Sequence, residues 1–159
     1  IGVRLVGSEM CIRDRYRHLL IAVDGSLLSE SAFKRALVFA KEMGATITLI
    51  RAIPEDHLLV YQAEMLGTTQ THHTDQARKN AQGYLDGLEM EARHALVPCN
   101  IVVVVNDHPH EAIVETAKSQ GCDLIIMGSH GRHGMTGFLL GSETQRVLAK
   151  TRLPVLVFR

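Results

Sequence analysis

A glycine-rich segment, residues 128–142, is the part of the sequence best suited to chemistry. It contains glycines at 128, 131, 134, 137 and 141, and Ser142 begins a predicted helix. Glycine lets a backbone approach a ligand closely and present its N–H groups at positive φ. The N–H groups and the dipole of a helix N-terminus favour an anion. We therefore expect a phosphate group to bind here.

The spacing of these glycines differs from two common phosphate-binding motifs. No Lys follows them as in G-x-x-x-x-G-K-[ST], and G-x-G-x-x-G is absent. Two residues separate Gly128 from Gly131, and nine more precede the pair Gly141-Ser142. This two-part spacing comes directly after an apolar segment, which indicates a loop at the end of a strand.

Short apolar segments alternate with amphipathic ones along the rest of the chain. Those that predict strands are 18–23, 46–52, 100–105, 123–127 and 154–158. Helical spacing of apolar residues lies between them, with Gly44 ending the first helix, a long helix starting near 74, and Pro109 opening the third. Residues 53–72 predict a loop with a short helical piece. This alternation predicts an α/β fold with a parallel sheet covered by helices on both faces.

In such a sheet, ligands bind outside the carboxyl ends of the strands, where the strand order reverses. Asp24 ends the first predicted strand and Gly128 follows the fourth. Asp-Gly is also a common plain turn, but this position favours a ligand role for Asp24. Ser142 has an alternative role as a helix N-cap, with Gln145 completing a capping box.

Three stretches carry a resemblance to a known family. They are HLLIAVDGS from His18, PHEAIVETAKSQGCDLIIMGSHGR from Pro109, and PVLVFR at the end. Together with the glycine spacing, they make residues 16–159 similar to the universal stress protein family. The resemblance implies a Rossmann-like three-layer sandwich with a five-stranded parallel sheet in the order 3-2-1-4-5. It also implies that ATP, ADP or AMP lies across the ends of the first and fourth strands.

The resemblance further implies a role for each matching residue. Asp24 would hydrogen-bond the ribose or help to hold a metal ion such as Mg²⁺, and Ala52 would offer backbone contacts to adenine. The residues expected at the ribose and α-phosphate are Met127, Gly128, Ser129, His130 and Gly131. Those expected at the outer phosphates are Gly141, Ser142 and Glu143. Where the family often has a Gly-Asp-Pro-like turn, this chain reads Asp107-His108-Pro109, so a side chain replaces a glycine near the nucleotide.

Composition narrows the classes of partner and compartment. The 17 Lys and Arg residues balance 17 Asp and Glu residues, so no broad basic surface for nucleic acid or membrane is expected. Three cysteines without a C-x-x-C motif predict a reducing, cytoplasmic setting. The histidine pairs along the chain offer no third ligand at suitable spacing, so no metal site made by the protein alone is predicted. The resemblance implies a homodimer through Val155 to Phe158.

Three functions stay open at this point. The first is a dimeric sensor or regulator of the stress response that binds an adenine nucleotide. The second is an enzyme, such as a slow ATPase, another phosphohydrolase or an adenylating ligase. The loop after the first strand lacks the S-G-G-x-D-S motif of such ligases. The third is a dimeric interaction module that binds no nucleotide. Residues 1–15 show no periodic pattern, so we expect either a non-native translated scar or a disordered native extension, followed by one domain over 16–159.

Overall fold

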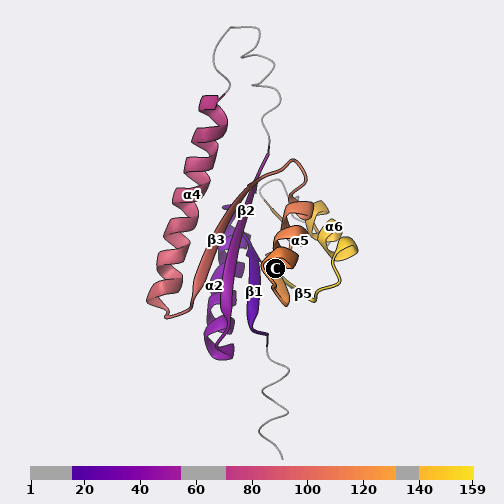
Figure 1. The fold of residues 1–159 in the computed structure, drawn as a ribbon. Helices are drawn as coiled ribbons and strands as arrows, with labels where there is room; N and C mark the ends of the chain where they lie inside the picture. Colours follow the sequence, from indigo (N-terminus) through magenta and orange to yellow (C-terminus); the bar gives the residue numbers. More distant parts are fainter. Residues whose placement is uncertain (1–15, 55–70, 132–139) are drawn as a thin grey trace, which may run out of the picture.

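The computed structural model describes residues 16–54, 71–131 and 140–159 (Figure 1). The strands are β1 (His18–Ala22), β2 (Thr46–Ile53), β3 (Cys99–Val105), β4 (Leu124–Gly128) and β5 (Val155–Phe158). The helices are α2 (Leu27–Met43), α4 (Thr71–His94), α5 (Pro109–Ser119) and α6 (Ser142–Lys150). The predicted alternation of strands and helices is therefore confirmed.

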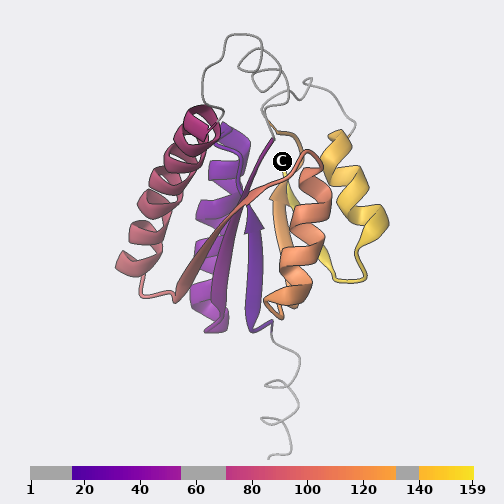
Figure 2. The same cartoon turned by 45° about the horizontal axis from the view of Figure 1, so that its top comes forward.

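The strands form one parallel five-stranded sheet in the order β3-β2-β1-β4-β5. Figure 2 shows α2 and α4 on one side of this sheet and α5 and α6 on the other. The predicted α/β Rossmann-like sandwich and its strand order are confirmed. The order reverses between β1 and β4, and the carboxyl ends of these two strands lie side by side. We call this end of the sheet, where the parallel strands finish, its carboxyl edge.

The two central strands are buried because helices cover both of their faces. Leu19 and Ile21 of β1 pack toward α2 and α4, whereas Leu20 packs toward α5 and α6. All three side chains have no exposed surface. Burying a side chain of this size contributes about 1.5–3 kcal/mol, so the alternation along β1 holds both helical layers to the sheet.

The ends of α2 follow from its local sequence. Ser26 Oγ accepts a hydrogen bond from the N–H of Ser29 at 3.2 Å, which caps the first turn. Gly44 ends the helix at a φ of +66°, a left-handed conformation that glycine adopts without strain. The helix therefore begins immediately after the Asp24-Gly25 turn and places that turn at the carboxyl edge of the sheet.

Several predicted boundaries are shifted. β2 extends one residue further, because Ile53 still pairs with Val105. Gly128 belongs to β4 rather than to the loop, because it pairs with Phe158. The long helix begins at Thr71, inside the segment predicted as a loop, and residues 55–70 of that segment lie outside the described residues.

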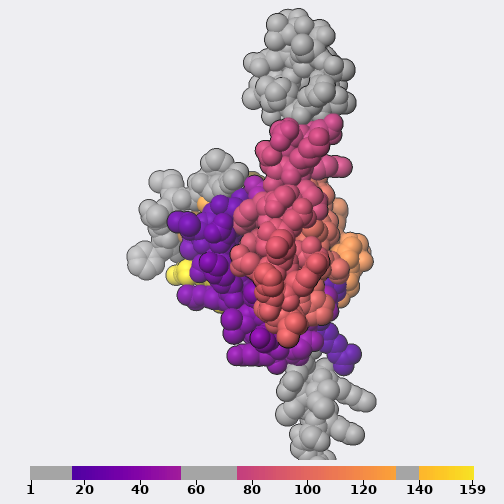
Figure 3. All heavy atoms as spheres, turned by 90° about the vertical axis from the view of Figure 1, so that its left-hand side faces the viewer, coloured from indigo at the N-terminus to yellow at the C-terminus, as the bar shows by residue number. Residues whose placement is uncertain are grey.

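α4 forms a long band over one side of the molecule (Figure 3). The aromatic ring of Tyr84 in α4 lies under the guanidinium group of Arg51 in β2. Arg51 Cζ is 4.7 Å from the ring centroid, and this contact holds the helix against the strand. In the described part of the chain, no helix is both long enough and apolar enough to cross a membrane.

Candidate functional site

Asp24 stands at the carboxyl end of β1, where the chain turns into α2. Gly25 follows it with a φ of +81°, which makes the sharp turn possible. Asp24 Oδ1 accepts a hydrogen bond from the N–H of Ser26 at 3.0 Å. The turn therefore fixes the carboxylate, which is only partly buried, at the edge where β1 meets β4.

Gly131 brings the loop after β4 against this carboxylate. A Cβ atom added at Gly131 would lie 2.7 Å from Asp24 Oδ2, closer than real Cβ contacts come. The two residues are far apart in the sequence, and the predicted sheet order is what brings them together. Any side chain at position 131 would have to displace the Asp24 carboxylate.

The beginning of the loop is folded back onto the start of α6. The N–H of Gly141 donates to the carbonyl of Ser129 at 2.8 Å, and a Cβ at Gly141 would lie 3.1 Å from the same oxygen. The buried hydroxyl of Thr144 donates to the carbonyls of Gly128 and Ser129 at 3.2 and 3.3 Å. Thr144 was not among the predicted site residues, because its sequence position shows only a polar residue in a helix.

The described glycines of the loop lie close to neighbouring residues, but their backbone conformation is ordinary. Gly128, Gly131 and Gly141 do not have φ in the left-handed region, so the expectation of positive φ is wrong for these three. At Gly131 and Gly141 a Cβ would instead crowd the Asp24 carboxylate and the Ser129 carbonyl.

The start of α6 lies at the exposed end of this loop. The helix begins at Ser142 as predicted, but Gly141 occupies the N-cap position, so the alternative role of Ser142 as N-cap is wrong. Gln145 does not complete a capping box, because its side chain donates to the carbonyl of Leu140 at 2.6 Å. Ser142 is exposed, and the N–H groups of a first helical turn lack intrahelical partners. Such N–H groups favour an anion, and binding of a phosphate at this position stays a prediction.

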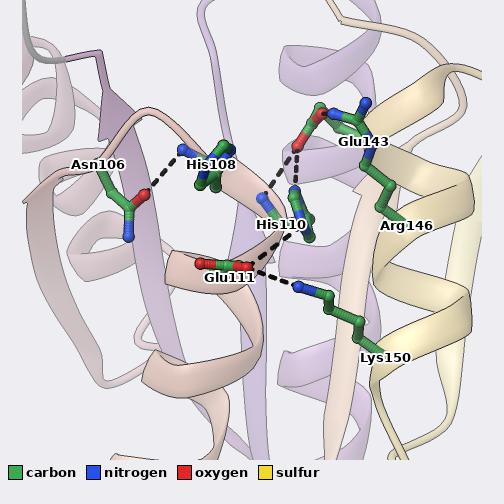
Figure 4. A network of polar contacts seen from close by, with 7 residues as sticks. All are labelled: Asn106, His108, His110, Glu111, Glu143, Arg146 and Lys150. Carbon is green, nitrogen blue, oxygen red and sulfur yellow. Dashed lines mark hydrogen bonds and ion pairs between the residues drawn. The ribbon is translucent and has the colours of Figure 1, made fainter.

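The Glu143 carboxylate is engaged by α5 and by its own helix (Figure 4). Its Oε2 lies 2.9 Å from His110 Nδ1 and accepts from the His110 backbone N–H at 3.0 Å, while Oε1 lies 2.6 Å from Arg146. Partial burial raises the pKa of Glu143, but these hydrogen bonds outweigh it, and the net pKa lies below its ordinary value. A direct contact of Glu143 with phosphate would therefore use its backbone N–H.

The other predicted residues surround the same edge. Met127 and Ser129 are buried, and the N–H of Ser129 donates to the carbonyl of Phe158 at 2.7 Å. Ser129 Oγ lies 3.1 Å from Nδ1 of His130, which is partly exposed. Ala22 pairs with Ile50, so the same register places Ala52 level with Asp24. The structure thus gathers the predicted residues along the ends of β2, β1 and β4.

The turn before α5 differs from the glycine-containing pattern expected by resemblance. Asn106 Oδ1 accepts a hydrogen bond from the N–H of His108 at 2.7 Å, which closes the turn. His108 is exposed at the N-cap position of α5. Among the described residues, no three His, Cys, Asp or Glu side chains come together as a metal site.

Fold and site together define a class of protein. It is a parallel α/β domain with an acidic turn after its first strand and a glycine-containing loop that leads into a helix N-terminus. Comparison with known proteins identifies the class. The sequence model described as the universal stress protein family matches residues 15–159, and the chain belongs to this family.

Curated relatives match along most of this chain. Universal stress protein MJ0577 of Methanocaldococcus jannaschii is 29% identical over 155 residues, which cover 91% of this chain and 95% of the relative. Universal stress protein Mb2028c of Mycobacterium bovis is 34% identical over 141 residues, 89% of this chain. This chain spans only 45% of that mycobacterial protein.

Solved structures share the fold. The structure of MJ0577 superposes with a TM-score of 0.78 at 29% identity, covering 90% of this chain and 95% of that one. A universal stress protein in complex with cAMP has a TM-score of 0.66 at 23% identity and covers 91% of this chain and 98% of that one. The Archaeoglobus fulgidus protein in complex with dAMP has a TM-score of 0.62 at 19% identity, with coverages of 91% and 98%.

Proposed function

We propose that this protein binds an adenine nucleotide, ATP or AMP, across the ends of β1 and β4, and that it acts as a dimeric sensor or regulator in the response to stress. In this proposal the phosphates lie at the N-terminus of α6, and the ribose lies at Asp24. Adenine lies near the backbone of Ala52. Mg²⁺ could accompany ATP through the phosphates and the Asp24 carboxylate.

The close approach of Gly131 to Asp24 is the observation that supports this proposal most strongly. The Asp24 carboxylate is an acceptor suited to ribose hydroxyls, and Gly131 has no side chain that would keep a ligand from the loop backbone. The same loop leads to the first turn of α6, where the N–H groups and the dipole favour phosphate. One ligand that carries hydroxyls at one end and phosphates at the other suits this arrangement.

The family supports the choice of adenine. Two universal stress proteins with the same fold have been solved in complex with cAMP and with dAMP. Both are less than 25% identical to this chain, so the ligand is carried over as part of the proposal. In this chain, a nucleotide bound across the ends of β1 and β4 would contact the residues gathered at the carboxyl edge of the sheet.

The nucleotide content of the purified protein tests the proposal. The protein is denatured, and the supernatant is separated by chromatography with mass detection. We expect ATP, ADP or AMP in a ratio approaching one per chain. Phosphate release from added ATP, followed in the same preparation, separates a binding protein from a slow ATPase.

Gly131→Val is the informative variant. Its side chain must displace the Asp24 carboxylate and narrow the loop, so we expect it to fold but to retain no nucleotide. Gly87→Val is the matched control, because a Cβ at Gly87 in α4 meets nothing within 4 Å. Absence of nucleotide from the wild type, together with no thermal stabilisation by added ATP, would contradict the proposal and favour an interaction module.

A further inference from the structure

The contact between α5 and α6 contains a buried histidine that sequence reasoning did not select. His110 is 6% exposed and lies in the first turn of α5. Its ring Nδ1 and its backbone N–H both reach the same oxygen, Glu143 Oε2, at 2.9 and 3.0 Å. A carboxylate can only accept hydrogen bonds, so Nδ1 carries the proton in this contact. Two donors of one residue therefore hold the Glu143 carboxylate.

Charged groups from both helices surround the ring (Figure 4). His110 Nε2 lies 3.9 Å from Glu111 Oε1, which Lys150 Nζ approaches to 2.6 Å. The ring of His108 is tilted against that of His110 at a centroid distance of 5.9 Å. Among the described residues, the titratable and charged groups in this network are His108, Glu111, Glu143, Arg146 and Lys150.

The charges of this network decide what a proton on His110 would do. Glu111 and Glu143 are balanced by Lys150 and Arg146, so the network has no net charge while the histidines are neutral. A proton on His110 makes it positive, and the buried ring between two carboxylates can accommodate that charge. Histidine is the side chain that ordinarily changes charge between about pH 5 and pH 8.

The network lies next to the proposed phosphate position. Glu143 is the second residue of α6, whose N-terminus would hold the phosphates. A carboxylate there would repel a phosphate unless other groups compensate its charge. The hydrogen bonds from His110 hold this carboxylate in place, and a charged ring would add attraction for the bound anion.

We propose that His110 is a positioning residue of the nucleotide site, which holds Glu143 between α5 and α6 and strengthens nucleotide binding when its ring is protonated. This inference rests on the proposed function. It assigns to the same site a dependence on pH and a specific residue that produces it.

Calorimetric titration with ATP at about pH 8 and about pH 6 tests the inference. Relative to the change seen in His110→Asn, we expect wild type to gain about threefold in affinity for ATP at the lower pH, because the charged ring attracts the phosphates. The Asn amide nitrogen can take the place of Nδ1 and donate to Glu143, but it cannot ionise. His110→Asn should match wild type at the higher pH and lack the additional gain at the lower pH.

Two further variants separate positioning from a general loss of structure. His110→Ala should bind ATP more weakly at both pH values. Adding Glu143→Gln to it should restore part of the binding, because the carboxylate that His110 no longer holds in place is removed. His94→Asn, an exposed position in the last turn of α4, should retain the wild-type pH profile. ATP and the other groups of the protein are the same in wild type and in His110→Asn, so the difference between their pH profiles isolates His110.

The outcomes are distinguishable. Identical pH profiles for wild type and His110→Asn would overturn the inference while nucleotide binding itself stands. Failure of wild type to bind ATP at either pH would instead overturn the proposed function, and the inference with it.

Discussion

At the scale of single residues, the site depends on a few pairs that meet across the sequence. The contact of Asp24 with Gly131 was within reach of sequence reasoning, because the strand order predicts which loops meet. The contact of His110 with Glu143 was not, because the two residues are 33 positions apart and their helices cover the same face of the sheet. No periodic pattern records which side chains meet between two helices.

Acid should weaken the Glu143 contact. Its pKa is lowered in the folded protein, so its contribution to stability is present above the ordinary carboxyl pKa of 4.5 and is lost as pH falls through the folded value. Glu143→Gln should lower the free energy of unfolding by about 1 kcal/mol or less near neutral pH, since a third of the side chain is exposed. Below the folded pKa the variant and wild type should converge.

Thermal unfolding of the Glu143→Gln protein over a pH series measures this effect. Glu89→Gln is a suitable control, because Glu89 forms an ion pair with the exposed side chain of Arg93 on the same helix, α4. A constant difference between wild type and Glu143→Gln down to about pH 3 would contradict this account of the pair.

At the scale of elements, apolar periodicity predicted where helices and strands lie, but not where they end. β2 and β4 each end one residue later than their predicted segments, because pairing with a neighbouring strand continues to that residue. α4 includes two glycines, which lower the helix propensity, yet its buried face of Ala81, Leu85 and Leu88 holds it on the sheet. Tertiary contacts therefore decide the boundaries.

The glycines of α4 offer a direct test at this scale. A Cβ at Gly83 or Gly87 would meet nothing within 4 Å, and both residues lie within the helix. Gly83→Ala and Gly87→Ala should each stabilise the protein by about 0.5–1 kcal/mol, because alanine loses less backbone entropy on folding. Urea unfolding measures the change. A loss of stability would show that these positions contact another part of the protein.

At the scale of the whole molecule, the sheet leaves two edges, β3 and β5, without a further strand in the described chain. The carbonyls of Pro154 and Phe158 accept hydrogen bonds from the N–H groups of Ile125 and Ser129. The N–H and C=O groups of Val155 and Val157 therefore point outward. We propose that a second copy pairs with this outward edge, as the family resemblance implies. Dimer formation through β5 stays a prediction.

Val157→Pro should separate the dimer. Proline removes an outward N–H while the hydrogen bonds from β5 to β4 are kept, which edge strands tolerate. Val103→Pro is the matched control. The carbonyl of Pro98 accepts a hydrogen bond from Ile47, and the N–H of Asn106 donates to the carbonyl of Ile53. The even positions of β3 therefore face β2, and the odd positions point away from it. Analytical ultracentrifugation should find monomers for the first variant and dimers for the second. Dimers in both would exclude β5 as the interface.

Calorimetric titration with ATP at neutral pH, of the wild-type protein beside Gly131→Val, shows whether a nucleotide binds where Asp24 and Gly131 come together. We expect saturable binding of one ATP per chain to wild type and none to the variant, with both proteins folded. A ligand at 100 times its Kd would also raise the stability of wild type by about 2.7 kcal/mol. No binding by wild type, or equal binding by Gly131→Val, would show that the edge formed by Asp24 and Gly131 is not a nucleotide site.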